Sequence, residues 1–313
     1  MIDRVKFAML CMARQCWEQG VAAQAMLECG DEPAFLLMAR DCVVRQNTDG
    51  RLCDVEGTPA LVDPAVCVEP VHEAGKILKD ENYIRAAQKN VDYLLHDCPA
   101  AEDGARYHLM GEEEIWADSM AMGPHVLMYA GHLDAGVDYY HAIRKRLWDP
   151  KTGLYRHKWS ESEQRFTRGL FWGVGNGWAL VGLMRMAKEL KAHKDPRADE
   201  IAADFTALLE AMLPYQAENG LFHDVLDDSS TFYESECTEM FAYSIYKMVL
   251  LDMCEERWLT AADRAREAVH SRVDAFGILQ GCAGSPTFEV EGTSVEGQAH
   301  LIMMEAAAAS LNR

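Results

Sequence analysis

Amphipathic helical periodicity recurs along almost the whole chain, and it restricts the fold more than any other feature. Apolar residues return every three or four positions in segment after segment, which is typical of helices with one buried face. The predicted helices are Val5–Glu18, Glu32–Arg45, Pro64–Leu78, Tyr83–His96, Glu112–Tyr129, Ala135–Leu147, Gly177–Leu190, Pro196–Leu213, Glu234–Cys254, Leu259–Val273 and Val295–Leu311, with one more near Val21–Leu27. Strand patterns are rare, and the best short candidates are Arg51–Val55 and Gly220–Leu226. The sequence therefore predicts an all-α protein.

The joints between these helices alternate between tight turns and long polar segments. The long segments are residues 48–63, 99–112, 149–172 and 276–293, and long loops often carry function. Helices joined as hairpins, with elaborated loops at one end, suit an (α/α)6 barrel, a closed toroid of six helical hairpins. The alternative is an open helical solenoid, but the sequence has no fixed-period repeat of the solenoid type. Without a linker rich in Pro, Ser or Gly, we expect one domain over residues 1–313.

Charge and composition exclude several classes of partner. The formal net charge of −20 argues against nucleic acid and anionic membranes, which require basic patches. The apolar run of residues 1–20 is interrupted by charges, unlike a signal peptide, and no stretch of about 18 uninterrupted apolar residues predicts a membrane span.

The ten cysteines are scattered and form no Cys-x-x-Cys pair. In a chain without a signal peptide they indicate reduced core thiols, a cytoplasmic location and no structural zinc site.

The segment Trp116-Ala117-Asp118-Ser119-Met120 places one carboxylate among large apolar side chains. Burial without partners penalises the charged carboxylate, so we expect Asp118 to be well hydrogen-bonded or to have a raised pKa. A raised pKa is what a general acid needs near neutral pH. The alternative interpretation is a solvated aspartate on the polar side of an amphipathic helix.

Three further groups of residues combine polar and aromatic side chains. Asp63 precedes Pro64 at the start of a predicted helix, where an N-cap is the simpler interpretation. His108 lies in the loop before Asp118, where it is either a site residue or a surface histidine. Residues 154–159 alternate aromatic and basic side chains, which suits a sugar acid or, alternatively, a hairpin with solvated cations.

Residues 171–178 read Phe-Trp-Gly-Val-Gly-Asn-Gly-Trp, with a helix predicted to begin at Gly177. Glycines at alternate positions let the backbone approach a ligand, and Trp172 and Trp178 flank them. A nucleotide loop is excluded, because no Lys-Ser/Thr ending and no βαβ unit accompany the glycines. A carbohydrate pocket is the better interpretation.

These motifs, in this order, resemble glycoside hydrolase family 105, the unsaturated rhamnogalacturonyl hydrolases, and more distantly the family 88 unsaturated glucuronyl hydrolases. The most specific pieces are residues 116–120 and 171–178, together with residues 292–298. The resemblance implies an (α/α)6 barrel that needs no metal or organic cofactor. It also implies hydrolysis of oligosaccharides bearing a 4,5-unsaturated uronic acid at the non-reducing end, as a polysaccharide lyase leaves them.

The resemblance also implies roles for individual residues. Asp118 matches the aspartate that protonates C4 of the enol ether, and Asp63 resembles the second family aspartate, which binds sugar or water. The residues expected to bind substrate are His108, Trp116, His157, Arg168, Trp172, Asn176 and Trp178. Val174 stands where well-known members carry Arg, so Arg168, Arg156 or Lys158 would have to meet the uronate carboxylate instead.

Two other functions remain open at this stage. An epimerase on the same toroid would use paired histidines as acid and base, and His108, His125, His157 and His300 are available. A non-catalytic sugar-acid-binding protein would retain the pocket without turnover.

Overall fold

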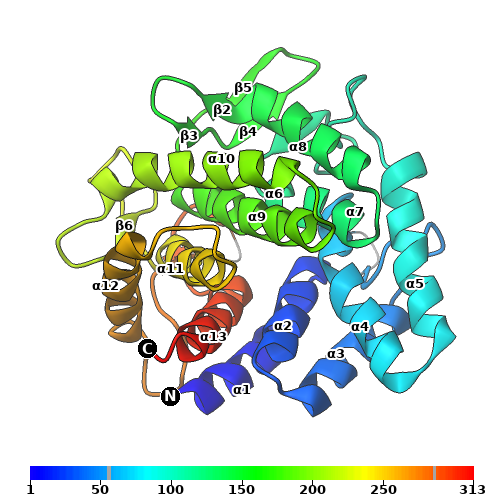
Figure 1. Cartoon of the computed structure of the whole chain (residues 1–313), viewed down its shortest axis with the longest axis horizontal. Helices are drawn as coiled ribbons and strands as arrows, with labels where there is room; N and C mark the ends of the chain where they lie inside the picture. Colours follow the sequence, from blue (N-terminus) through cyan, green and yellow to red (C-terminus); the bar gives the residue numbers. More distant parts are fainter. Residues whose placement is uncertain (55–57, 285–286) are drawn as a thin grey trace. The chain divides into compact units, whose positions relative to one another are not determined.

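The computed structural model describes residues 1–54, 58–284 and 287–313 (Figure 1). The chain divides into two compact units. The first unit comprises residues 1–12, 148–157 and 168–313, and the second comprises residues 13–147 and 158–167. One domain over residues 1–313 stays a prediction.

The first unit is built from helices that pack in pairs. They are α1 (Ile2–Met12), α9 (Gly173–Ala192), α10 (Arg197–Met212), α11 (Ser235–Leu250), α12 (Leu259–His270) and α13 (Val295–Ser310), with the short 3-10 helices η3 (Leu213–Tyr215) and η4 (Glu256–Trp258). The pairs are α9 with α10, α11 with α12, and α13 with α1. Helix α11 also packs against both α9 and α13 (Figure 1).

Burial distinguishes inner from outer helices in this unit. Every residue from Ser235 to Tyr246 of α11 is buried, because neighbouring helices cover all of its faces. Its partner α12 buries only one face, chiefly through alanines, Leu259 and Val269. Helices α9 and α13 resemble α11 in this respect.

Short antiparallel hairpins occupy the loops of the first unit. They pair β2 (Trp148–Asp149) with β3 (Leu154–Tyr155), β6 (Phe222–His223) with β7 (Tyr233–Glu234), and β8 (Cys282–Ala283) with β9 (Glu291–Gly292). The strand predicted over Gly220–Leu226 is therefore formed only at residues 222–223.

The second unit repeats the same pairing of helices. Its elements are α2 (Cys16–Glu28), α3 (Glu32–Val44), the 3-10 helix η1 (Asp63–Cys67), α4 (Val68–Leu78), α5 (Glu81–Asp92), the π-helix η2 (Tyr93–Asp97), α6 (Ser119–Met122), α7 (Pro124–Tyr129) and α8 (Leu133–Leu147). The pairs are α2 with α3, α4 with α5, and α7 with α8. Aspartate side chains cap the beginnings of α3 and α5. Asp31 accepts the Ala34 N–H at the start of α3, and Asp80 accepts the Asn82 N–H at the start of α5.

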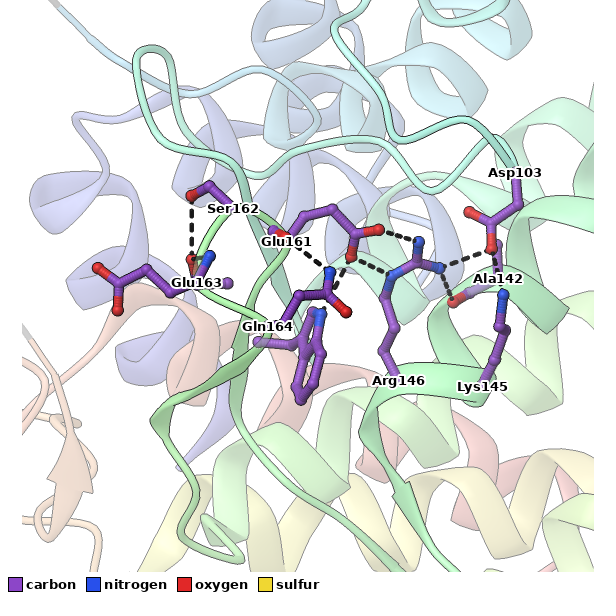
Figure 2. A network of polar contacts seen from close by, with 10 residues as sticks. Asp103, Ala142, Lys145, Arg146, Glu161, Ser162, Glu163 and Gln164 are labelled. Carbon is purple, nitrogen blue, oxygen red and sulfur yellow. Dashed lines mark hydrogen bonds and ion pairs between the residues drawn. The ribbon is translucent and has the colours of Figure 1, made fainter.

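A small sheet lies beside α8 in the second unit. Strand β1 (Glu114–Trp116) pairs antiparallel with β4 (Lys158–Ser160), with Ile115 opposite Trp159, and β5 (Arg165–Arg168) joins the other edge of β4. Figure 2 shows how Arg146 of α8 holds the loop after β4: its guanidinium forms two bonds of 2.8 Å to Glu161 and one of 2.9 Å to Asp103. This bidentate pair fixes the end of β4 and therefore the position of Lys158.

The predicted helix over Glu112–Tyr129 is wrong. The chain forms strand β1 there and then two short helices, α6 and α7. Ile115 and Trp116 face partners across the sheet, so their apolar character reflects strand pairing rather than a helical face. The two short helices meet at Gly123, directly before Pro124, whose ring and missing N–H prevent a continuous helix.

Two other boundaries also differ from prediction. The predicted helix Val5–Glu18 covers the end of α1 and the start of α2. The Glu18 carboxylate accepts the N–H groups of Arg14 and Gln15 and so stabilises the beginning of α2. The helix predicted near Val21–Leu27 is part of α2. Residues 51–54 form no strand, and Val55 lies outside the described residues. Among the described residues, no helix is both long and apolar enough to cross a membrane.

Candidate functional site

Asp63 and His108 form a buried pair in the second unit. Nε2 of His108 lies 3.5 Å from Oδ1 of Asp63, and both side chains are more than nine-tenths buried. The Asp63 side chain does not cap its helix, since Val62 occupies the N-cap position. The N-cap interpretation of Asp63 is therefore wrong.

The backbone around His108 explains why it faces Asp63. Its N–H donates to the Glu114 carbonyl at 2.8 Å, and its carbonyl accepts the Leu61 N–H at 3.0 Å. The histidine is thus tethered both to β1 and to the segment just before Asp63. On its other side, Nδ1 lies 3.1 Å from the Ser119 hydroxyl.

Trp116 and Lys158 extend this arrangement. The Trp116 ring stacks on His108 with centroids 4.2 Å apart, and the Lys158 ammonium lies 3.3 Å from the Trp116 ring centroid. A cation over an indole face is attracted by the ring quadrupole. The register of β1 against β4 produces this contact, because Trp116 lies directly opposite Lys158.

Asp118 is half-buried and immediately precedes Ser119, the first residue of α6. It therefore lies at the start of a short helix, not on the face of a long one. Its neighbour Ser119 contacts His108, so the backbone brings Asp118 to the same part of the unit as Asp63. The raised pKa expected for Asp118 stays a prediction. We call Asp63, His108, Trp116, Asp118 and Ser119 the Asp118 cluster.

A second cluster, which we call the His157 cluster, lies in the first unit and consists of His157, Arg168, Trp172 and Asp224. The Arg168 guanidinium approaches Nδ1 of His157 at 2.9 Å. Because arginine only donates, Nδ1 accepts, and the proton of neutral His157 belongs on Nε2. The Trp172 ring lies 4.4 Å from the His157 ring, and Arg168 lies 5.2 Å from the Trp172 ring centroid.

Asp224 completes the His157 cluster, and sequence reasoning missed it. Its Oδ1 accepts the indole N–H of Trp172 at 2.9 Å. Burial raises the pKa of Asp224, although the Trp172 hydrogen bond and the charge of Arg168 act in the opposite direction. The available signal was a single aspartate within the apolar run of residues 221–226.

Asn176 and Trp178 are both buried in α9, where their contacts are internal. The Asn176 amide accepts the Tyr155 N–H at 2.9 Å and donates to the carbonyls of Tyr155 and Trp172. It therefore joins strand β3 to the start of α9. Trp178 packs edge-on against His300, with ring centroids 5.0 Å apart.

The glycines at the start of α9 serve helix packing. The helix begins at Gly173, four residues earlier than predicted. A Cβ at Gly173 would lie 2.9 Å from the His223 carbonyl oxygen, and one at Gly177 would lie 2.6 Å from the Met240 sulfur. These two glycines let the end of β6 and helix α11 approach α9 closely.

Three carboxyl groups are buried at the beginning of α11. Glu234 accepts the N–H groups of Cys237 and Ala283, and Glu236 accepts the Ser294 hydroxyl at 2.7 Å. Burial raises the pKa of Glu234 to about 8 and that of Glu239 well above its usual range. Glu234 is the N-cap of α11, and burial penalises the charged forms of all three acids.

The residue types of each cluster suit a different kind of chemistry. The Asp118 cluster has two carboxyl groups and a histidine, the residue types that transfer protons at carbon or water. The His157 cluster has a guanidinium and an indole, which suit a carboxylate and a sugar ring respectively.

The chain is similar to known glycoside hydrolases. The model of Glycosyl Hydrolase Family 88 matches residues 3–306. The unsaturated rhamnogalacturonyl hydrolase YesR of Bacillus subtilis (strain 168) is 30% identical over 172 residues, which cover 51% of this chain and 50% of that protein. The aligned part thus spans about half the length of this curated relative.

Solved structures share the fold. A possible member of the GH105 family from Salmonella enterica has a TM-score of 0.86 at 17% identity, covering 100% of this chain and 93% of its own. The family 105 glycoside hydrolase from C. acetobutylicum ATCC 824 has a TM-score of 0.77 at 17% identity, and the match covers 95% of this chain and 94% of that chain. These likenesses confirm the predicted (α/α)6 barrel.

Proposed function

Because the chain belongs to glycosyl hydrolase family 88, we propose that it releases a 4,5-unsaturated uronic acid from the non-reducing end of lyase-generated oligosaccharides. The family assignment agrees with the resemblance found in the sequence motifs. A rhamnogalacturonan-type substrate is our first choice, because the motif at residues 171–178 resembles that of the rhamnogalacturonyl hydrolases. The observation that carries the proposal is the Asp63–His108–Ser119 contact directly beside Asp118.

The proposed reaction is a hydration followed by collapse. The Asp118 carboxylic acid donates its proton to C4, which leaves an oxocarbenium ion at C5. Water adds to C5 and returns one proton to the Asp118 carboxylate. The resulting hemiketal opens the ring, and the hemiacetal freed at C1 expels the aglycone as an alcohol. One water is consumed, and Asp118 ends in its starting protonation state.

Asp63 and His108 are proposed to hold the attacking water or the sugar ring. A carboxylate and an imidazole 3.5 Å apart can together accept and donate hydrogen bonds to one hydroxyl group. Trp116 is proposed to form an apolar wall beside the acid, and Ser119 to orient the His108 ring.

The uronate carboxylate needs a cation, and Val174 does not supply one. Its side chain is buried in the first turn of α9. Arg156 already forms an ion pair of 2.6 Å with Asp149. Lys158 and Arg168 are the better candidates, because Lys158 lies over Trp116 in the Asp118 cluster and Arg168 lies over Trp172 in the His157 cluster. We also propose that His157 and Trp172 bind substrate, whereas Asn176 and Trp178 support that surface from within α9.

We further propose that residues 1–313 act as one catalytic domain in the cytoplasm. All ten cysteines are free, which suits a reducing compartment. The net charge of −20 still argues against a nucleic-acid partner.

The test is an ultraviolet assay with an unsaturated rhamnogalacturonan disaccharide. The conjugated enol-uronate absorbs and the hydrated product does not, so turnover appears as loss of absorbance. Wild type should consume the substrate, and Asp118→Asn should be inactive while keeping its circular dichroism spectrum and unfolding midpoint. Asp134→Asn, which changes an exposed aspartate of the second unit, is the matched control and should retain activity.

Retained activity in Asp118→Asn would remove this aspartate from the mechanism. If wild type leaves the substrate unchanged, unsaturated glucuronyl substrates come next. A product of unchanged mass would instead favour the epimerase, and saturable binding without turnover would favour the sugar-acid-binding protein.

A further inference from the structure

Three cysteines that are distant in sequence meet in the core of the second unit. Cys42 belongs to α3, Cys53 to the following loop, and Cys67 to the end of η1. Their sulfur atoms all lie within 4.8 Å of one another, and all three side chains are buried. Sequence spacing gave no sign of this thiol cluster, because it contains no Cys-x-x-Cys pair.

The spacing of the sulfurs suits a shared metal ion. Zinc–sulfur bonds of about 2.3 Å place neighbouring thiolates about 3.8–4.0 Å apart in tetrahedral or trigonal geometry. Sulfurs within 4.8 Å therefore need only a small inward shift to coordinate one ion. No pair among the three forms a disulfide, and all remain free thiols.

The backbone at Cys53 is held against the segment that carries Cys42. Its φ of +53° is in the left-handed region that non-glycine residues avoid. Its N–H donates to the Cys42 carbonyl at 3.0 Å, which holds the loop against the end of α3.

The nearby Arg45 charge also favours a bound cation with thiolate ligands. Three thiolates and one divalent ion carry a net charge of −1, and the Arg45 guanidinium is close enough to interact electrostatically with Cys42 and Cys53.

We propose that Cys42, Cys53 and Cys67 form a binding site for a soft divalent metal ion of the Zn²⁺ class, with a water molecule completing the coordination. Each thiol loses its proton to solvent when it coordinates the ion. The site would tie α3 and the Cys53 loop to η1, the helix that begins with Asp63. The metal therefore has a structural role behind the Asp118 cluster and takes no part in the reaction proposed above.

Cadmium is the probe, because cadmium–thiolate bonds give a charge-transfer band in the ultraviolet. Reduced, chelator-treated protein should bind one Cd²⁺ per chain with this band, and Zn²⁺ should displace it. Cys53→Ser and Cys67→Ser should each weaken binding at least tenfold. Cys237→Ser, which changes a buried cysteine of the first unit, should bind as wild type does.

The proposal is overturned if wild type gives no saturable band, or if Cys53→Ser and Cys67→Ser both keep wild-type affinity. A variant that does not fold leaves the wild-type ¹¹³Cd NMR spectrum to decide. A chemical shift in the range of three thiolate ligands supports the site, and a shift in the oxygen-ligand range excludes it. These measurements need no substrate, so they are independent of the proposed hydrolase activity.

Discussion

Nε2 of His108 lies 3.5 Å from Oδ1 of Asp63, although the two residues are separated by a helical hairpin and a long loop. The pair is buried, and Ser119 contacts the opposite ring nitrogen of His108. The imidazole is thus held between the residue that begins η1 and the residue that follows Asp118.

We expect His108→Gln to lower kcat/KM by about 10²-fold, the order of loss when a group that positions a reactant is removed. Glutamine retains an amide near the Ser119 hydroxyl but has no imidazole to share with Asp63. Steady-state ultraviolet assays measure the effect, and urea unfolding checks that stability is close to wild type. The exposed His132→Gln is the control. Wild-type kinetics in His108→Gln would contradict a role for this histidine at the site.

Trp172→Phe should lower the free energy of unfolding by about 1–3 kcal/mol, because it leaves the buried Asp224 carboxyl without its indole donor. Asp224→Asn retains an acceptor oxygen for the indole N–H of Trp172, so it should lower the free energy of unfolding less than Trp172→Phe does. Urea unfolding of both variants and of the double variant measures the coupling between the two side chains.

The control for this pair is Trp178→Phe, which removes the same atoms from another buried indole. Equal losses in Trp172→Phe and Trp178→Phe would mean that lost packing, and not the hydrogen bond to Asp224, accounts for the effect.

Glu239→Gln should weaken the pH dependence of stability. Neither carboxyl oxygen of Glu239 has a hydrogen-bond partner in the described parts of the chain. Burial and the nearby Glu236 and Glu234 raise its pKa well above the usual value. Above the ordinary pKa of about 4.3, the folded state retains a proton that the unfolded state releases, so stability falls as pH rises.

In Glu239→Gln, the free energy of unfolding should fall less steeply with pH, by about 1.4 kcal/mol per pH unit between about pH 5 and pH 8. Urea unfolding at several pH values measures it. The pKa of Glu234 is raised to about 8, so Glu234 also makes the free energy of unfolding fall as pH rises, and this second decrease ends near pH 8. The exposed Glu210→Gln is the control. Parallel curves for wild type and Glu239→Gln would show that Glu239 ionises in the folded state as it does in the unfolded chain.

Gly173→Ala should destabilise the protein by about 1–3 kcal/mol, the usual penalty for overpacking. Its new methyl group meets the rigid carbonyls of His223 and Asp224. Gly177→Ala should have a smaller effect, because the flexible Met240 side chain can move away. Thermal unfolding of the two variants gives the comparison. A larger loss for Gly177→Ala would contradict this account of how α9 packs.

Local sequence patterns predicted much of the fold. Helical periodicity identified most of the helices, because an amphipathic helix needs only neighbours along the chain to reveal its buried face. The same patterns failed at residues 112–129. There Ile115 and Trp116 have partners on β4, more than forty positions away, which no local window contains.

Local sequence predicted some features of the candidate site, and tertiary structure decided the others. The residue types around Asp118 and Trp172 pointed to proton transfer and sugar binding, because carboxyl, imidazole and indole groups carry those properties wherever they lie. Tertiary structure alone decided that His108 meets Asp63, that Asp224 accepts from Trp172, and that Asn176 bonds to the backbone. It also brought Cys42, Cys53 and Cys67 together. Contacts between distant residues depend on how helices and loops pack, and no local pattern records that packing.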